Sequence, residues 1–157
     1  MGTQPDMHIL GFLLTDGARL LRNGFERRIA DAGLGITPGE ARTLLSVHTL
    51  KDCRQMEIAA RMGVEPMTVC TYLDKLQAMD LIDRQPDPTD RRAKRITVTP
   101  ASEPLIAALR TEIAAVVTQA VDGLSAEEVA CLRHSLETMT GNLQAEAAPA
   151  NDKTVSP

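Results

Sequence analysis

Two short helical patterns joined by a tight turn, and followed at once by a two-strand pattern, constrain this chain more than any other feature. The helical pair covers residues 52–80, where Gly63 closes the first helix and Pro66 suits the first turn of the second. Beyond a segment rich in Pro and Asp, Ile96 and Val98 alternate with threonines, which predicts a short β-hairpin. The order helix, turn, helix, hairpin is therefore expected in the middle of the chain.

Long amphipathic helices are predicted on both sides of this segment. Apolar residues recur every three or four positions over 10–29, 105–124 and 129–143. These three stripes hold more apolar surface than a small lobe can cover, which predicts that they bury it between two copies of the chain. From Gln144 onward the composition turns to Ala, Pro, Asn and Asp, so residues 144–157 are expected to form a disordered tail.

Capping patterns mark where several helices begin. Thr37-Pro38-Gly39-Glu40 and Ser125-Ala126-Glu127-Glu128 both have the spacing of a capping box. Asp52 and Gln55 have the same spacing ahead of the short helix, and predict Asp52 as its cap.

The net charge of −4 argues at first against nucleic acid, because duplex binding depends on Lys and Arg that neutralise phosphates. The charge is unevenly placed: residues 1–50 are neutral, 51–95 carry +1 and 96–157 carry −5. Residues 84–95, at the hairpin, carry a local +3. A solvated loop would explain a basic run, but its position directly after a helix-turn-helix pattern favours duplex DNA.

Composition excludes several other classes. Phe12, Phe25 and Tyr72 are the only aromatic residues, which argues against stacking platforms for single-stranded nucleic acid. No apolar run approaches the roughly 18 residues that span a bilayer, and no basic residue precedes Arg19, so a cytoplasmic protein is expected, without membrane or secretory segments. The familiar hydrolase and phosphate-binding motifs are missing, so no enzymatic activity and no cofactor are predicted.

The chain resembles the MarR-type winged helix-turn-helix transcriptional regulators. The resemblance covers about residues 10–143 and rests on Gln55-Met56-Glu57-Ile58-Ala59, Leu73-Asp74-Lys75-Leu76 and Leu81-Ile82-Asp83-Arg84. Its most specific part is Asp87-Pro88-Thr89-Asp90-Arg91-Arg92, leading to Ile96-Thr97-Val98-Thr99-Pro100. It departs from the family pattern at Cys70-Thr71, where many members carry Thr-Arg, and at Asp80, where a glycine is common.

This resemblance implies a mainly α fold with a small β-hairpin wing. One domain over 8–143 would consist of a winged helix-turn-helix lobe at 36–100 and dimerisation helices at 8–32 and 103–143. It further implies a homodimer that binds a pseudo-palindromic duplex operator and acts as a repressor, released by a small phenolic or carboxylate ligand or by cysteine oxidation. A helical protein-interaction adaptor without DNA binding is the alternative.

The same resemblance places Arg92 in the minor groove, with Asp90 as the acid that braces its guanidinium. The remaining candidate DNA contacts are Arg91, Lys94 and Arg95 on the wing, and Pro66, Met67, Thr68, Cys70, Thr71 and Lys75 on the second helix.

Three cysteines without CxxC spacing suit a reducing compartment rather than disulfides or zinc. Cys53 is the redox candidate, because a helix N-terminus and neighbouring cations lower a thiol pKa; a structural cysteine is the alternative. The three histidines share no ligand spacing, so no metal site is predicted. For a ligand, the chain offers four arginines on the first helix, for which a solvated face is the other reading: Arg19, Arg22, Arg27 and Arg28.

Overall fold

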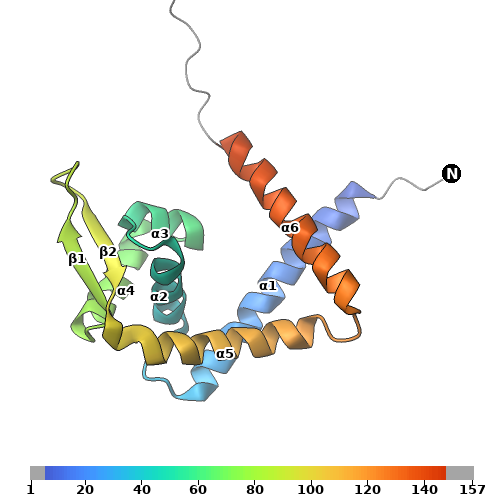
Figure 1. Ribbon diagram of the computed structural model, residues 1–157, viewed down its shortest axis with the longest axis horizontal. Helices are drawn as coiled ribbons and strands as arrows, with labels where there is room; N and C mark the ends of the chain where they lie inside the picture. The colour runs from blue at the N-terminus through green and yellow to red at the C-terminus, as the bar shows by residue number, and fades with distance from the viewer. Residues whose placement is uncertain (1–5, 148–157) are drawn as a thin grey trace, which may run out of the picture. The chain divides into compact units, whose positions relative to one another are not determined.

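The computed structural model describes residues 6–147, which fold into helices with one small hairpin, as predicted (Figure 1). The elements are α1 (Met7–Ala32), α2 (Pro38–Leu50), α3 (Gln55–Met62), α4 (Pro66–Ala78), β1 (Ile82–Pro86), β2 (Lys94–Val98), the 3-10 turn η1 (Pro100–Ser102), α5 (Glu103–Ala120) and α6 (Ala126–Ala147). The chain divides after Ala120 into two compact units. A single domain over 8–143 stays a prediction.

Local sequence determines most helix ends. Asp6 caps α1 by accepting the backbone N–H groups of His8 and Ile9, so this helix begins three residues before the apolar stripe that predicted it. The Thr37 capping box is confirmed: Thr37 Oγ1 accepts the Glu40 N–H at 3.3 Å, and Glu40 Oε2 accepts the Thr37 N–H at 2.9 Å.

The predicted cap of α3 is wrong. Arg54, not Asp52, occupies the N-cap position, and Glu57 Oε2 accepts the Arg54 backbone N–H at 2.6 Å. The reason lies one residue earlier, where Cys53 is extended and forms an isolated β-bridge with Ile96 of β2. A residue held in that pairing cannot begin a helix, so α3 starts after it.

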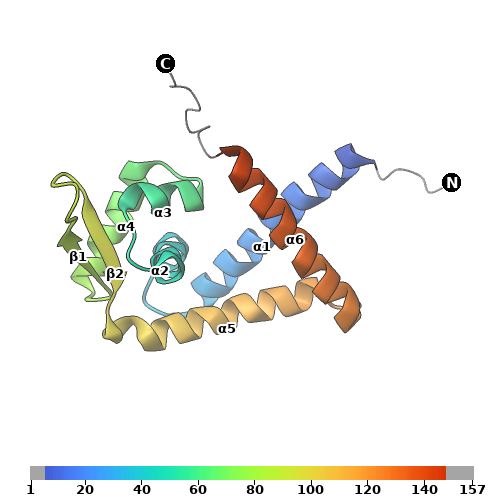
Figure 2. The same ribbon diagram turned by 45° about the horizontal axis from the view of Figure 1, so that its top comes forward.

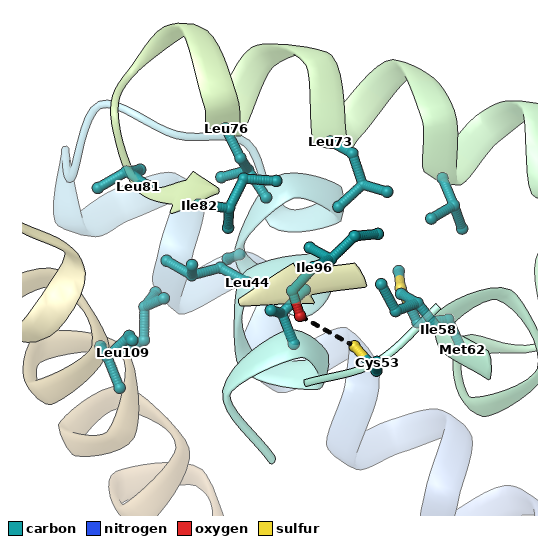
Figure 3. Close-up of a cluster of buried hydrophobic side chains, with 14 of the residues drawn as sticks. Leu44, Cys53, Ile58, Met62, Leu73, Leu76, Leu81, Ile82, Ile96 and Leu109 are labelled. Carbon is teal, nitrogen blue, oxygen red and sulfur yellow. Dashed lines mark hydrogen bonds between the residues drawn. The ribbon is translucent and has the colours of Figure 1, made fainter. Parts of the chain in front are cut away.

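The hydrophobic core of the first unit lies where α2, α3, α4 and the hairpin meet. In Figure 3, Leu73 and Leu76 of α4 point toward Ile82 and Ile96 of the hairpin, with Leu44 of α2 beside them. Each of these side chains is buried. Burial of each such side chain is worth about 1.5–3 kcal/mol, so this cluster holds the wing to the helical pair.

Helices α1 and α5 cross in both Figure 1 and Figure 2 and pack on each other at the crossing. Gly24 allows this approach, because a Cβ there would lie 3.1 Å from Cγ1 of Val116. Arg28 Nε and Glu112 Oε2 add an ion pair at 2.6 Å. The N-terminal half of α1, by contrast, leaves most of its apolar residues exposed, among them Ile9, Phe12 and Leu13.

The second unit consists mainly of α6. Its capping box is confirmed, since Ser125 Oγ accepts the Glu128 N–H and Glu128 Oε2 accepts the Ser125 N–H. Helix α6 continues to Ala147, so the prediction that a disordered tail begins at residue 144 is wrong. The residues Gln144, Ala145 and Glu146 favour helix, which explains the extension. Residues 148–157 of that predicted tail lie outside the described residues. No residue of α6 is buried.

Candidate nucleic-acid interface

Helix α4 is the best placed element for reading a duplex. Val69, Leu73 and Leu76 bury its inner side, and Gln55 Nε2 ties its start to α3 by donating to the Pro66 carbonyl at 2.9 Å. Of the predicted contacts, Met67, Thr68 and Thr71 are exposed, while Pro66 and Cys70 are half-buried. Its N-terminal half therefore presents methyl and hydroxyl groups, which suit thymine methyls, base edges and phosphates.

The Lys75 side chain is paired with an acid of α2, whereas the sequence predicts it as a DNA contact on the second helix. Although its side chain is exposed, Nζ lies 3.4 Å from Oε1 of the buried Glu40 carboxylate on α2. The ammonium is therefore directed toward the N-terminus of α2 and shares its charge with an acid. Lys75 is a weaker candidate for a phosphate contact than a free lysine would be.

Tyr72 sets the distance between α4 and α2. A Cβ built on Gly39 would lie 2.4 Å from the ring carbon Cζ of Tyr72 and 2.5 Å from its hydroxyl oxygen. A side chain at position 39 would have to displace this ring, so Gly39 lets the reading helix pack closely on α2 with Tyr72 in its present place.

Substitution of Gly39 by alanine is expected to destabilise the fold by about 1–3 kcal/mol, since the added methyl overpacks a filled contact. The measurement is urea unfolding followed by circular dichroism. Because the space is set by the ring, Gly39→Ala combined with Tyr72→Leu should cost less than the sum of the two single changes. Strict additivity would show that the tyrosine ring is not what excludes the methyl.

The wing is the antiparallel pair β1–β2, with Arg84 opposite Ile96 and Pro86 opposite Lys94. Arg84 NH1 bonds to Asp74 Oδ1 at 2.8 Å and so ties the hairpin to α4. Neither Arg84 nor Asp74 was a predicted site residue, because their partnership joins two elements that only the fold brings together.

The cations of the wing divide into two groups. Arg91, Arg92 and Lys94 are exposed at the tip, and none of them forms an ion pair within residues 6–147. Arg95 is different: its NH1 donates to the Asp52 carbonyl at 2.9 Å, and its Nε lies 3.1 Å from Asp87 Oδ2. The prediction that Arg95 is a phosphate contact is therefore not supported by its geometry, because its guanidinium is engaged at the base of the wing.

The predicted brace between Asp90 and the Arg92 guanidinium is also absent from the described structure. Asp90 Oδ1 accepts the backbone N–H of Arg92 at 2.9 Å instead. The acid therefore shapes the turn that carries Arg92 and leaves its side chain free to reach outward.

A buried carboxylate that sequence reasoning missed organises the base of this turn. The Asp87 side chain has no exposed surface, and its Oδ1 accepts the Thr89 N–H, the Thr89 hydroxyl and the Asp90 N–H at 2.7–3.1 Å. Its Oδ2 accepts from Arg54 Nε at 2.8 Å. Hydrogen bonds from Thr89, joined by that of Arg54, hold the pKa of the Asp87 carboxyl far below its ordinary range.

Cys53 does not have the properties of a redox-sensitive thiol. Its side chain is 2% exposed, and its Sγ lies 3.7 Å from the Ile96 carbonyl oxygen (Figure 3). Burial, together with the nearby acids Glu57 and Asp52, raises the pKa of this thiol to about 11. The predicted lowering of its pKa is wrong, because the residue precedes the helix and faces the core.

Cys53 is expected to be the slowest of the three cysteines to react with a thiol reagent at pH 8, because so little of it is thiolate. Cys131 is exposed and should react first. Mass-spectrometric mapping of alkylation over time measures the order, and denaturant should remove the protection of Cys53. Alkylation of folded Cys53 as fast as Cys131 would contradict the structure.

A separate cleft lies between α2 and α5. It has a volume of about 700 Å³, and its lining includes the apolar residues Leu45, Ile113 and Val117 together with the cations Arg61 and Arg110. The four α1 arginines considered from the sequence are not among its lining residues. An apolar wall beside cations suits a small aromatic carboxylate.

The comparisons with known proteins agree with this geometry. Residues 36–94, which include the helical pair and most of the wing, match the family model described as the MarR family. Transcriptional regulator PA3341 is 31% identical over 87% of this chain and 98% of its own, with a TM-score of 0.68. A MarR transcriptional regulator from Methanosarcina mazei Go1 is 19% identical over 88% and 98% of the two chains, with a TM-score of 0.74.

A third solved structure carries a ligand in its description. It is BpsR from Bordetella bronchiseptica, whose DNA binding is described as regulated by 6-hydroxynicotinic acid. That chain is 21% identical over 83% of this chain and 98% of its own, with a TM-score of 0.66.

Within residues 6–147, no helix has the length and apolarity to cross a bilayer, and no three potential metal ligands cluster.

Proposed function

Because this chain belongs to the MarR family of transcriptional regulators, we propose that it binds a pseudo-palindromic duplex as a homodimer and represses transcription. The observation that carries this proposal is the pairing of two exposed features on one lobe. One is the polar N-terminal half of α4, and the other is the wing tip with its exposed Arg91, Arg92 and Lys94.

Each feature suits a different part of B-DNA. A helix fits the major groove, where side chains reach base edges, and an arginine at a hairpin tip gains from the negative potential of a narrow minor groove. We assign Arg92 to the minor groove, Arg91 and Lys94 to phosphates, and Met67, Thr68 and Thr71 to the major groove. Pro66 and Cys70 stay second-rank candidates because they are half-buried.

Dimerisation is supported by apolar surface that the single chain leaves uncovered. Leu132 and Leu136 of α6 are 42% and 41% exposed, and Phe12 of α1 is 61% exposed. Large exposed apolar surfaces of this kind mark interaction sites, and a second copy of the same chain offers the matching stripes. A dimer would place two reading helices about one turn of DNA apart, roughly 34–36 Å.

Salt dependence tests the proposed function. Fluorescence anisotropy with a labelled duplex should give an affinity that falls steeply between about 50 and 200 mM salt, because the wing cations displace counterions. A single strand of the same sequence should bind far more weakly, since the chain has few aromatic residues on which bases could stack. Equal affinity for the single strand and for the duplex would contradict the proposal.

We propose release of the operator by a small aromatic carboxylate in the α2–α5 cleft, rather than by oxidation of Cys53. The Arg61 and Arg110 side chains supply the positive charge such a ligand needs, and Ile113 and Val117 supply the apolar wall. A ligand that binds the DNA-free form better shifts the population away from the operator complex.

Substitution of Arg110 by alanine should weaken this release. With 6-hydroxynicotinate or salicylate as the probe, the concentration needed to dissociate the duplex is expected to rise about tenfold, because one charged hydrogen bond is lost. Duplex affinity without the probe should stay unchanged, since Arg110 lies on α5, away from the wing. An unchanged response would place the ligand elsewhere.

A further inference from the structure

We propose that Arg54 is a positioning residue for DNA binding, which sets the place of Arg92 at the wing tip through Asp87 and Asp90. This rests on the proposed function, since it takes Arg92 as the minor-groove contact. The inference follows from an unusual residue at the start of α3 and from an unbroken series of hydrogen bonds between that residue and the backbone of Arg92.

Arg54 occupies a position at which its side chain cannot serve its own helix. An N-cap side chain normally accepts a hydrogen bond from the first turn, as Ser, Thr, Asp and Asn do. A guanidinium only donates, and Arg54 makes no side-chain cap. Glu57 completes the helix start by accepting the Arg54 N–H, which leaves the Arg54 side chain available for another role.

The first link joins α3 to the wing. Arg54 Nε donates to Asp87 Oδ2 at 2.8 Å, and its NH2 donates to the Thr89 hydroxyl at 3.0 Å. The partners lie 33 and 35 residues away in sequence. The Asp87 side chain is fully buried while the Arg54 side chain is 38% exposed, so this charge-assisted bond is directional and only partly screened by salt.

The next links run through the turn itself. Asp87 Oδ1 accepts the Asp90 N–H at 3.1 Å, and Asp90 Oδ1 accepts the Arg92 N–H at 2.9 Å. The Asp90 carbonyl also accepts the Ala93 N–H at 3.0 Å, which closes the turn. The position of the Arg92 backbone is therefore defined relative to α3 by three successive polar contacts.

This arrangement has a consequence for DNA reading. A lobe that engages both grooves gains full affinity only when the wing tip and α4 reach their contacts together. Arg84 and the core hold the base of the hairpin, but the tip beyond Pro86 depends on the contacts of Asp87 and Asp90. Arg95 also reaches Asp87, so removal of Arg54 loosens the tip without leaving Asp87 unpaired.

The decisive variant is Arg54→Ser, which removes the link and supplies a residue suited to capping α3. Its unfolding temperature should equal or exceed that of the wild type, while its duplex affinity falls about tenfold, an effect typical of residues coupled in one network. Arg54→Lys keeps the charge and should recover part of the affinity. A drop in affinity that simply follows a drop in stability would overturn the proposal.

A double-mutant cycle separates positioning from direct contact. In an Arg92→Ala background, Arg54→Ser should change duplex affinity less than about twofold, because the residue it positions is gone. A full additional loss in that background would show that Arg54 binds phosphate itself and would overturn the positioning role.

Hydrogen exchange without DNA tests the link independently of the proposed function. The amides of Thr89 and Asp90, both bonded to Asp87, should exchange faster in Arg54→Ser than in the wild type. Unchanged exchange overturns the proposal. Faster exchange in a protein whose wild type shows no duplex affinity would keep the link and overturn only the DNA-binding role of the wing.

Discussion

Replacement of Arg92 by alanine is expected to lower operator affinity about 30- to 100-fold, equivalent to about 2–3 kcal/mol, and to leave the fold intact. The side chain is exposed at the wing tip and forms no ion pair with the described residues, so its loss removes no contact of the folded lobe. What it removes is the insertion of a guanidinium into a groove of negative potential. Anisotropy titration at fixed salt measures the loss, and thermal unfolding checks the fold.

Arg91→Ala and Lys94→Ala serve as matched controls, because both neighbours are exposed cations on the same tip. As phosphate contacts, each should weaken binding to all sequences equally and reduce the slope of log affinity against log salt by about one. Arg92→Ala should instead cost most on sites with a narrow A·T-rich minor groove. Equal losses for the three variants on all duplexes would contradict a special role for Arg92.

The second large effect is expected on the apolar face of α6. Leu132→Glu combined with Leu136→Glu should convert the dimer to monomers and lower operator affinity more than about a hundredfold. Each leucine contributes about 1.5–3 kcal/mol when it is buried, and a two-fold interface loses each of them twice. A monomer also contacts only one of the two half-sites, so its loss of affinity exceeds the loss caused by removing any single contact.

A control on the opposite side of α6 isolates this face. Ala130→Glu with His134→Glu places the same two charges two positions earlier, about 200° round the helix, at residues that are also exposed. That variant should stay dimeric. Sedimentation velocity measures the mass against the 17.0 kDa of one chain. A dimer that survives the leucine substitutions would place the interface elsewhere.

Features encoded by neighbouring residues could be predicted from the sequence. The Thr37 and Ser125 capping boxes, the closing Gly63 and the hairpin were all read from patterns within a few residues. Each rests on a local hydrogen bond or on side-chain periodicity, which do not depend on the rest of the fold. The same holds for the family resemblance, whose most specific part is one continuous segment at the wing.

Features that depend on distant partners could not be read in this way. Arg91 and Arg95 are both arginines of the same basic segment, yet Arg95 is held by Asp52 and Asp87 while Arg91 is exposed and forms no ion pair among residues 6–147. The sequence predicts Cys53 at a helix start with a lowered thiol pKa, but pairing with Ile96 buries the residue and its pKa is raised instead. In the sequence Asp87 is one of several acids in a segment rich in Pro and Asp, and only the folded hairpin shows that its carboxylate is buried and organises the turn.

Selection of duplexes from a random library tests the central claim most directly, that a dimer of this chain reads DNA with α4 and the wing. We expect enrichment of two inverted half-sites whose centres lie about 10–10.5 base pairs apart, and loss of that enrichment in Arg92→Ala. Enrichment of a single unpaired site, or none above background for the wild type, would contradict it.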